Sequence, residues 1–310
     1  MSFLFEISLI VILIGFANSS IGVFLVLNDK SMISFALSHA VLLGIIISYG
    51  IIPDLYSPIF IIISGIIGFI IVSIVELLNK VKFIDYNSAL GFVYLTVFAI
   101  SIILISTNNL DIYYSLESIV SGQLLYLPFF RTTFLGIDLP SIAWIMISLI
   151  ILNFTVIFLT WKELLITSFD PLYAQLNGFS TNFITTIILL LSSMTIVGSY
   201  NAVGPLLVIA FIITPPAISF LYSNDLKQIF FLTFPIMVVC SLIGVQIAYI
   251  FDISPAGVIA LTFGIFFLLS LIFAPNSNLK KYIFSKSNKV NMPKNITYDH
   301  IDDHKNSVIE

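Results

Sequence analysis

Residues 58–75 read PIFIIISGIIGFIIVSIV, a stretch without any charged side chain. A helix needs about 20 predominantly apolar residues to cross roughly 30 Å of hydrocarbon, so this stretch predicts a membrane-spanning helix. Stretches of the same character recur along the chain on both sides of it. We expect nine spans, at residues 4–27, 33–51, 56–78, 88–107, 139–160, 181–199, 203–222, 229–250 and 255–273.

The composition of the whole chain agrees with this expectation. Of the 310 residues, 59% are hydrophobic and only 9% are charged, whereas a soluble domain carries about 25% charged residues. A transmembrane β-barrel would show strands of about 10 residues with alternating polarity, and the sequence has no such alternation. The composition therefore predicts an all-α, polytopic helical membrane protein in contact with the lipid bilayer. The less regular stretch 108–138 is compatible with a short or re-entrant helix.

The lysine residues predict how the chain is oriented. The lysines between the spans lie in alternate loops: Lys30, Lys80, Lys82, Lys162 and Lys227. Further lysines follow the last span. Because basic residues favour the cytoplasmic side, we expect the N-terminus outside and the C-terminus in the cytoplasm, with Arg131 on the outer side. Eight spans would fit this alternation only if one segment were re-entrant. Residues 1–275 then form the membrane domain, and 276–310 form a polar cytoplasmic tail.

The predicted cytoplasmic loop 161–180 contains start and stop signals for a short helix, at about 168–178. Asp170 can cap the free N–H groups, Pro171 suits the first helical position, and Gly178 suits the position past the end. Leu172 and Leu176 stand four residues apart on one face. So short a helix is not stable alone in water, so it needs either the membrane interface or a partner protein to rest on.

Two features inside the spans are candidates for function. His39 is an ionisable group in an apolar span, and neutral imidazole binds first-row metals well; the alternative is a histidine hydrogen-bonded to a neighbouring helix. The second feature is a predicted helix break, which is a candidate because broken helices often line transport pathways. The alternative is a simple packing kink. The residues of this predicted break are Gly204, Thr214, Pro215 and Pro216.

The sequence lacks the motifs of several other functions. It contains no phosphate-binding loop of the form G-x-x-x-x-G-K-[S/T], no pairing of a nucleophile with a base, and no Cys/His zinc pattern. It also has no basic stripe for nucleic acid. We therefore expect no catalytic residue, no permanently bound cofactor and no nucleic-acid partner.

Four stretches resemble one family, in the expected order. Residues 36–44 read ALSHAVLLG and closely resemble the DALSHAVLxG signature of the ABC-3 family, the permeases of manganese, zinc and iron importers. Residues 168–178 resemble the cytoplasmic coupling segment of that family, residues 203–215 its VGxLLVxALLxTPA span, and residues 252–257 its DLPSG turn. The resemblance covers nearly all of residues 1–275.

The resemblance implies the permease subunit of an ATP-driven importer, with a type II importer-like fold in a bacterial-type cell membrane. It implies a separate cytoplasmic ABC ATPase that binds at 168–178, an extracytoplasmic metal-binding protein and a second permease copy, identical or different. The transported ion would be divalent manganese or zinc, with iron next, and His39 would lie on its pathway. A proton-coupled secondary metal transporter is the alternative and would need no ATPase.

One position departs from the family pattern. The family carries an aspartate four residues before the histidine, one helical turn away on the same face, and its metal site uses this pair. Here Phe35 occupies that position, and a phenyl ring offers no charge to a divalent cation. Either another residue replaces the carboxylate, or His39 contributes to a site that a different permease subunit completes.

Overall fold

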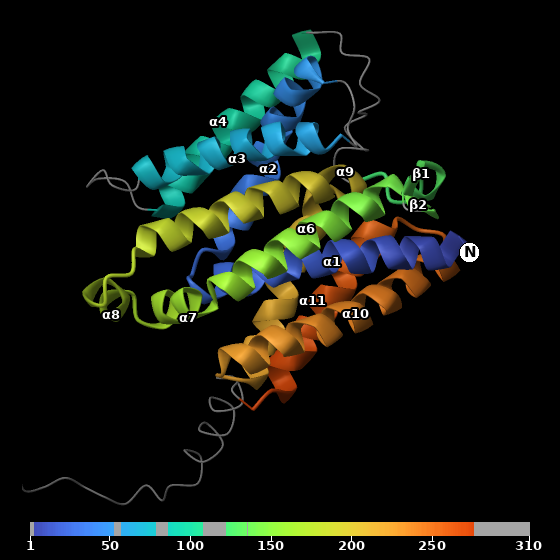
Figure 1. The fold of residues 1–310 in the computed structure, drawn as a ribbon. Helices are drawn as coiled ribbons and strands as arrows, with labels where there is room; N and C mark the ends of the chain where they lie inside the picture. The colour runs from blue at the N-terminus through green and yellow to red at the C-terminus, as the bar shows by residue number, and fades with distance from the viewer. Residues whose placement is uncertain (1–2, 53–56, 79–85, 108–121, 135, 276–310) are drawn as a thin grey trace, which may run out of the picture.

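The computed structural model describes residues 3–52, 57–78, 86–107, 122–134 and 136–275 (Figure 1). Within these residues, eight helices are long and apolar enough to cross a membrane. They are α1 Phe3–Leu27, α2 Ser31–Ile51, α3 Pro58–Leu78, α4 Tyr86–Thr107, α6 Ser141–Leu159, α9 Thr181–Tyr222, α10 Leu226–Phe251 and α11 Pro255–Phe273. Two short helices, α7 Trp161–Phe169 and α8 Pro171–Leu176, join α6 to α9. The predicted helical membrane protein is confirmed.

Helix α9 is two helices that meet at Gly204, where the backbone leaves the helical region with φ 74° and ψ 166°. Asn18 of α1 donates to Ser199 at 2.7 Å, and the adjacent Ser19 donates to the carbonyl of Phe211 at 2.8 Å. A straight helix would separate residues 199 and 211 by about 18 Å. The chain therefore reverses at Gly204, so the eight described helices make nine passes. The reversal separates the predicted spans 181–199 and 203–222.

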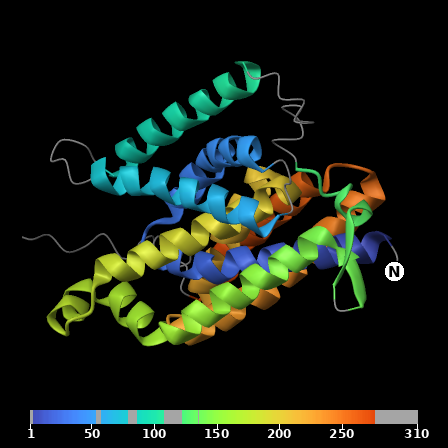
Figure 2. The same ribbon diagram turned by 45° about the horizontal axis from the view of Figure 1, so that its top comes forward.

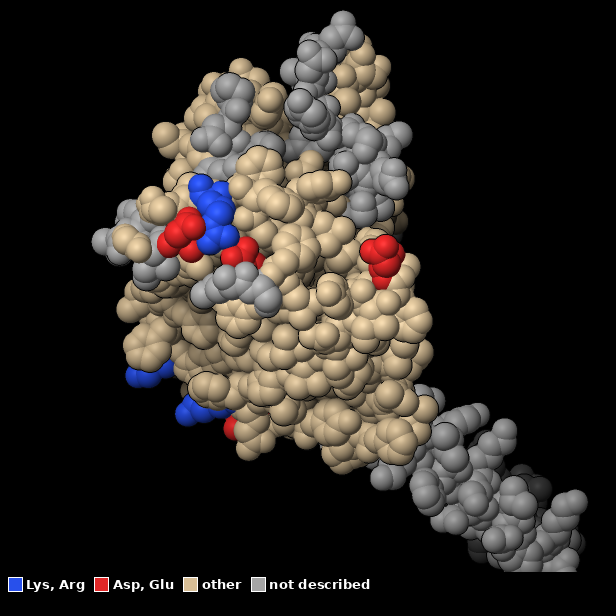
Figure 3. All heavy atoms as spheres, turned by 90° about the vertical axis from the view of Figure 1, so that its right-hand side faces the viewer, with Lys and Arg blue, Asp and Glu red and all other residues tan. Residues whose placement is uncertain are grey.

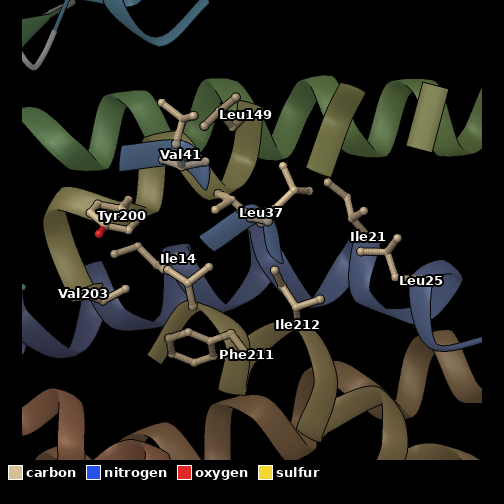
Figure 4. Packing of buried hydrophobic residues seen from close by; sticks show 14 of the residues in the cluster. Ile14, Ile21, Leu25, Leu37, Val41, Leu149, Tyr200, Val203, Phe211 and Ile212 are labelled. Atoms are coloured by element: carbon tan, nitrogen blue, oxygen red, sulfur yellow. The ribbon is translucent and has the colours of Figure 1, made fainter. Parts of the chain in front are cut away.

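Helix α1 lies at the centre of the bundle, against α9, α10 and α6 (Figure 1). Figure 4 shows Ile14 of α1 among Tyr200, Val203 and Phe211 of α9, all of them buried. Helix α4 lies at the edge, beside α2 and α3 (Figure 2). Only a minority of its side chains are buried and several of its large apolar side chains are exposed, as expected of a helix that faces lipid or another subunit.

Polar side chains tie the buried helices together. Asn153 of α6 donates to Thr195 of α9 at 3.0 Å and to the Ala17 carbonyl of α1 at 3.2 Å. Ser193 of α9 donates to the Gly65 carbonyl of α3 at 2.7 Å. Hydrogen bonds between membrane helices contribute about 0.6–2 kcal/mol each. These bonds hold α1, α3 and α6 around the first half of α9.

The prediction of a short or re-entrant helix in 108–138 can be compared with the structure only from residue 122 onward. Residues 108–121 lie outside the described part of the chain. The residues after them form a single 3₁₀ turn, η1 Leu127–Phe129, and an antiparallel hairpin of β1 Arg131–Phe134 and β2 Ile137–Pro140. Thr132 and Thr133 favour an extended strand, and Gly136, with φ 78°, provides the turn. Because 137–140 belong to β2, the span predicted at 139–160 begins at Ser141.

Candidate functional site

His39 lies on α2 and faces α4 in an aromatic setting. Its ring centroid is 4.7 Å from that of Phe35, one turn earlier, and 5.6 Å from those of Tyr94 and Phe98 on α4. Its Nδ1 lies 3.0 Å from the Phe35 carbonyl oxygen. A carbonyl can only accept, so this bond requires a proton on Nδ1, and in the neutral ring Nε2 then keeps the lone pair that can bind a metal.

The described residues form no complete metal site around His39. They contain no group of three or more His, Cys, Asp or Glu side chains that could hold a metal ion. The ring of Phe35, 40% exposed, occupies the place of the carboxylate that the resemblance implies. A first-row metal prefers several nitrogen and oxygen ligands, so one imidazole beside three aromatic rings makes at most part of a site.

The predicted helix in the 161–180 loop is present as α8. The Asp170 carboxylate accepts the Tyr173 N–H at 2.9 Å, Pro171 is the first residue of the helix, and Gly178 has a φ of 83°. Leu172 and Leu176 are 71% and 79% exposed. The helix projects from the end of the bundle where α6 ends and α9 begins (Figure 1). Its exposed leucine pair is suited to cover an apolar surface on another molecule.

The predicted break in α9 lies at Gly204 and not at the paired prolines, where the helix continues through Thr214, Pro215 and Pro216. A proline removes the N–H that would bond the carbonyl four residues earlier. Ser19 of α1 donates to the carbonyl that Pro215 frees, at Phe211. This hydrogen bond is the expected consequence of the N–H that Pro215 lacks, because a freed carbonyl inside a membrane protein must accept a hydrogen bond from protein or water.

The carbonyls four residues before the other two prolines of α9 also lie against other segments of the chain. The Ile212 carbonyl, which Pro216 frees, lies against Gly22 of α1. The Asn201 carbonyl, at the end of the first half of α9, accepts the Gln123 N–H at 3.3 Å. Nothing in the sequence marks Ser19, Gly22 or Gln123 as neighbours of these carbonyls. The acceptor carbonyls are predictable, because each lies four residues before a proline. The groups that approach these carbonyls are not predictable from the sequence.

Charged side chains gather at the two ends of the bundle. At the end that holds the hairpin, Arg131 donates from Nη1 to Glu6 at 2.9 Å and from Nε to Asp138 at 2.7 Å. Figure 3 shows this end, with basic and acidic side chains grouped at one edge of a largely uncharged surface. The bonds to Glu6 and then to Asp138 raise the pKa of Arg131. At the other end Lys30 pairs with Glu76 at 2.6 Å. Lys80, Lys82 and the predicted tail lie outside the described residues.

The comparisons with known proteins agree on one family. The ABC 3 transport family matches residues 1–274. The manganese transport system membrane protein MntD of Bacillus subtilis is 30% identical over 91% of this chain and 95% of its own length. The zinc transport system membrane protein TroD of Treponema pallidum is 32% identical over 87% of this chain and 74% of its own length.

Solved structures show the same fold. A chain of PsaBC from Streptococcus pneumoniae, solved in complex with Fab, superposes with a TM-score of 0.77 and 28% identity. The match covers 91% of this chain and 95% of that one. A putative metal-chelate type ABC transporter in an inward-facing conformation superposes with a TM-score of 0.62 at 14% identity, which shows likeness of fold alone.

Proposed function

The chain belongs to the ABC 3 transport family, and from this premise we propose that it is the membrane-spanning subunit of an ATP-driven importer of a divalent transition metal. The observation that carries the proposal is the family match, which extends over residues 1–274 and therefore over every described span. Manganese and zinc are the first candidate substrates, because relatives of both kinds align along most of the chain. Iron is the next candidate.

A separate ABC ATPase supplies the energy in this proposal and binds α8. Two observations support this. The sequence has no phosphate-binding loop of its own, and Leu172 and Leu176 are exposed on a capped helix at one end of the bundle. Lys162 lies in α7, which precedes this helix, Lys30 lies between α1 and α2, and Lys227 lies in the first turn of α10 at the same end. The positive-inside rule makes this end cytoplasmic, and hence the N-terminus external and the C-terminus cytoplasmic.

The metal reaches the permease from an extracytoplasmic binding protein and passes His39. In this proposal the Nε2 lone pair of His39 is a transient ligand for the passing ion. Because Phe35 supplies no carboxylate, the remaining ligands come from a second permease copy. A different subunit with the Asp/His pair intact would supply the missing charge, whereas two identical copies would bring only two imidazoles together.

Transport by the purified complex tests the proposal. The chain is co-expressed with the ATPase from its own operon, and the copurified complex is reconstituted into liposomes that contain ATP or no nucleotide. We expect uptake of Mn²⁺ or Zn²⁺ only with ATP, at a rate that a protonophore does not change. Uptake that follows a proton gradient without ATP would identify a secondary transporter instead, and failure of any ATPase to copurify would remove the main support for an ABC importer.

A further inference from the structure

Helix α7 is attached to the bundle through the ring of its first residue, Trp161. The Trp161 ring centroid lies 6.2 Å from that of Phe24 on α1 and 5.6 Å from that of Phe230 on α10, with interplanar angles of 83° and 81°. These are edge-to-face contacts, the geometry that aromatic pairs prefer. Phe24 and Phe230 are themselves 6.2 Å apart, so Trp161 closes a triangle of rings from three helices.

This triangle continues into the membrane part of the bundle. Phe230 also contacts Phe154 of α6 at 5.8 Å and Phe234 at 5.1 Å. Phe234 in turn stacks on Phe16 of α1, with centroids 4.9 Å apart. We call these rings the aromatic cluster: Phe16, Phe24, Phe154, Trp161, Phe230 and Phe234. Its members come from α1, α6, α7 and α10.

The cluster lies between the exposed helix α8 and the centre of the bundle. Beyond Trp161, α7 is held by the buried side chains of Leu164 and Thr167 and by a 3.2 Å hydrogen bond from Asn28 of α1 to Ser168. Phe24, Phe230 and Phe234 are buried, and closely packed rings transmit a displacement because they have few rotamers. A push on α8 can therefore reach α1 and α10 through the Trp161 ring, and it can also reach α1 through the bond between Asn28 and Ser168.

We propose that Trp161 is a positioning residue for energy coupling, which carries movement of α7 and α8 to α1 and α10. The proposal rests on the proposed function, in which an ATPase binds α8. It adds a residue that contacts neither ATPase nor metal and acts through its two ring neighbours. Spatial continuity alone does not establish coupling between sites, so the test must measure coupling itself.

The ratio of metal transported to ATP hydrolysed measures coupling directly. We expect Trp161→Leu to copurify with the ATPase and to hydrolyse ATP, with a ratio at least about fivefold below that of the wild type, because two ring contacts are lost. Trp161→Phe keeps an aromatic edge and should restore most of the ratio. The matched control is Trp144→Leu, since Trp144 lies by the hairpin at the other end, where it donates to the Thr132 carbonyl. An unchanged ratio in Trp161→Leu would overturn the proposal.

A label on the same ring tests the proposal without disturbing the cluster. Trp144 and Trp161 are the two tryptophans of the chain, so fluorotryptophan incorporated into Trp144→Phe places a single ¹⁹F nucleus at Trp161. In a complex with unlabelled ATPase, we expect the resonance to shift between the nucleotide-free and ATP-trapped states. A resonance unaffected by nucleotide in a complex that still transports metal would refute the role of Trp161. Failure of the wild-type chain to bind any ATPase would instead refute the proposed function.

Discussion

Replacing Gly22 with alanine tests the closest approach between α1 and α9. A Cβ built on Gly22 would lie against the carbonyl oxygen of Ile212, 2.8 Å from its carbonyl carbon and 3.0 Å from its Cα. Carbon atoms pack at about 3.5–4.0 Å, so the two helix backbones would have to separate by roughly 0.5–1 Å. The added Cβ is fixed to the backbone of α1 and the Ile212 carbonyl belongs to the backbone of α9, so no side-chain rotation can relieve the clash.

The expected loss of stability follows from two opposing effects. Overpacking costs about 1–3 kcal/mol, and alanine in place of glycine inside a helix returns about 0.5–1 kcal/mol. The net loss lies between about 0 and 2.5 kcal/mol and is centred near 1 kcal/mol, which corresponds to a fall in apparent Tm of about 2–4 °C. Thermal unfolding in detergent at one scan rate measures this shift.

Gly264 of α11 provides the matched control. It lies on an exposed helix face, and a Cβ added there has nothing within 4 Å, so Gly264→Ala should keep or slightly raise the Tm. If Gly22→Ala were as stable as Gly264→Ala, the close approach of α1 to the Ile212 carbonyl would be wrong. The placement of the second half of α9 against α1 would then be wrong as well.

Three further changes test the candidate site and the ends of the bundle. Leu172→Asp combined with Leu176→Asp should leave folding intact, since both side chains are exposed, but should abolish copurification of the ATPase; normal metal uptake would contradict the docking role. Phe35→Asp should strengthen Mn²⁺ binding in calorimetry about tenfold by adding a hard oxygen ligand one turn from the imidazole, and a further His39→Ala change should reverse the gain; equal affinities would place the site elsewhere. Arg131→Met should release the hairpin from α1 and speed proteolysis between β1 and β2 relative to wild type, and an unchanged rate would show that the ion pairs do not hold it.

The sequence predicts the number and order of the membrane passes because each depends on local composition. An apolar stretch of the right length has few alternatives to a transmembrane helix. The α8 helix was predictable for a similar reason, since Asp170, Pro171 and Gly178 act through backbone geometry within a few residues. The break at Gly204 was also indicated, although the paired prolines beyond it proved compatible with a continuous helix.

The faces of the helices were not predictable from this one chain. In lipid, apolar residues surround a helix on all sides, so hydrophobic periodicity does not mark the buried face. Nothing in the sequence pairs Arg131 with Glu6, 125 positions away, or places His39 beside Tyr94. The hairpin was missed because strands of four residues are too short to show a clear alternation of polar and apolar side chains.

The prolines of α9 and the aromatic cluster together limit how the bundle can move. Ser19 of α1 donates to the Phe211 carbonyl that Pro215 frees, so sliding α1 along α9 would leave this buried acceptor without its donor. Phe24, on the next turn of α1, contacts Trp161. A movement of α7 that displaces α1 must therefore carry the second half of α9 with it. The first half of α9 is bonded to α3 and α6, and Asn18 of α1 donates to Ser199 in the same half. Helix α1 is therefore bonded to both halves of α9, on either side of the reversal at Gly204, and a displacement of α1 carries both halves unless the bond from Asn18 to Ser199 breaks.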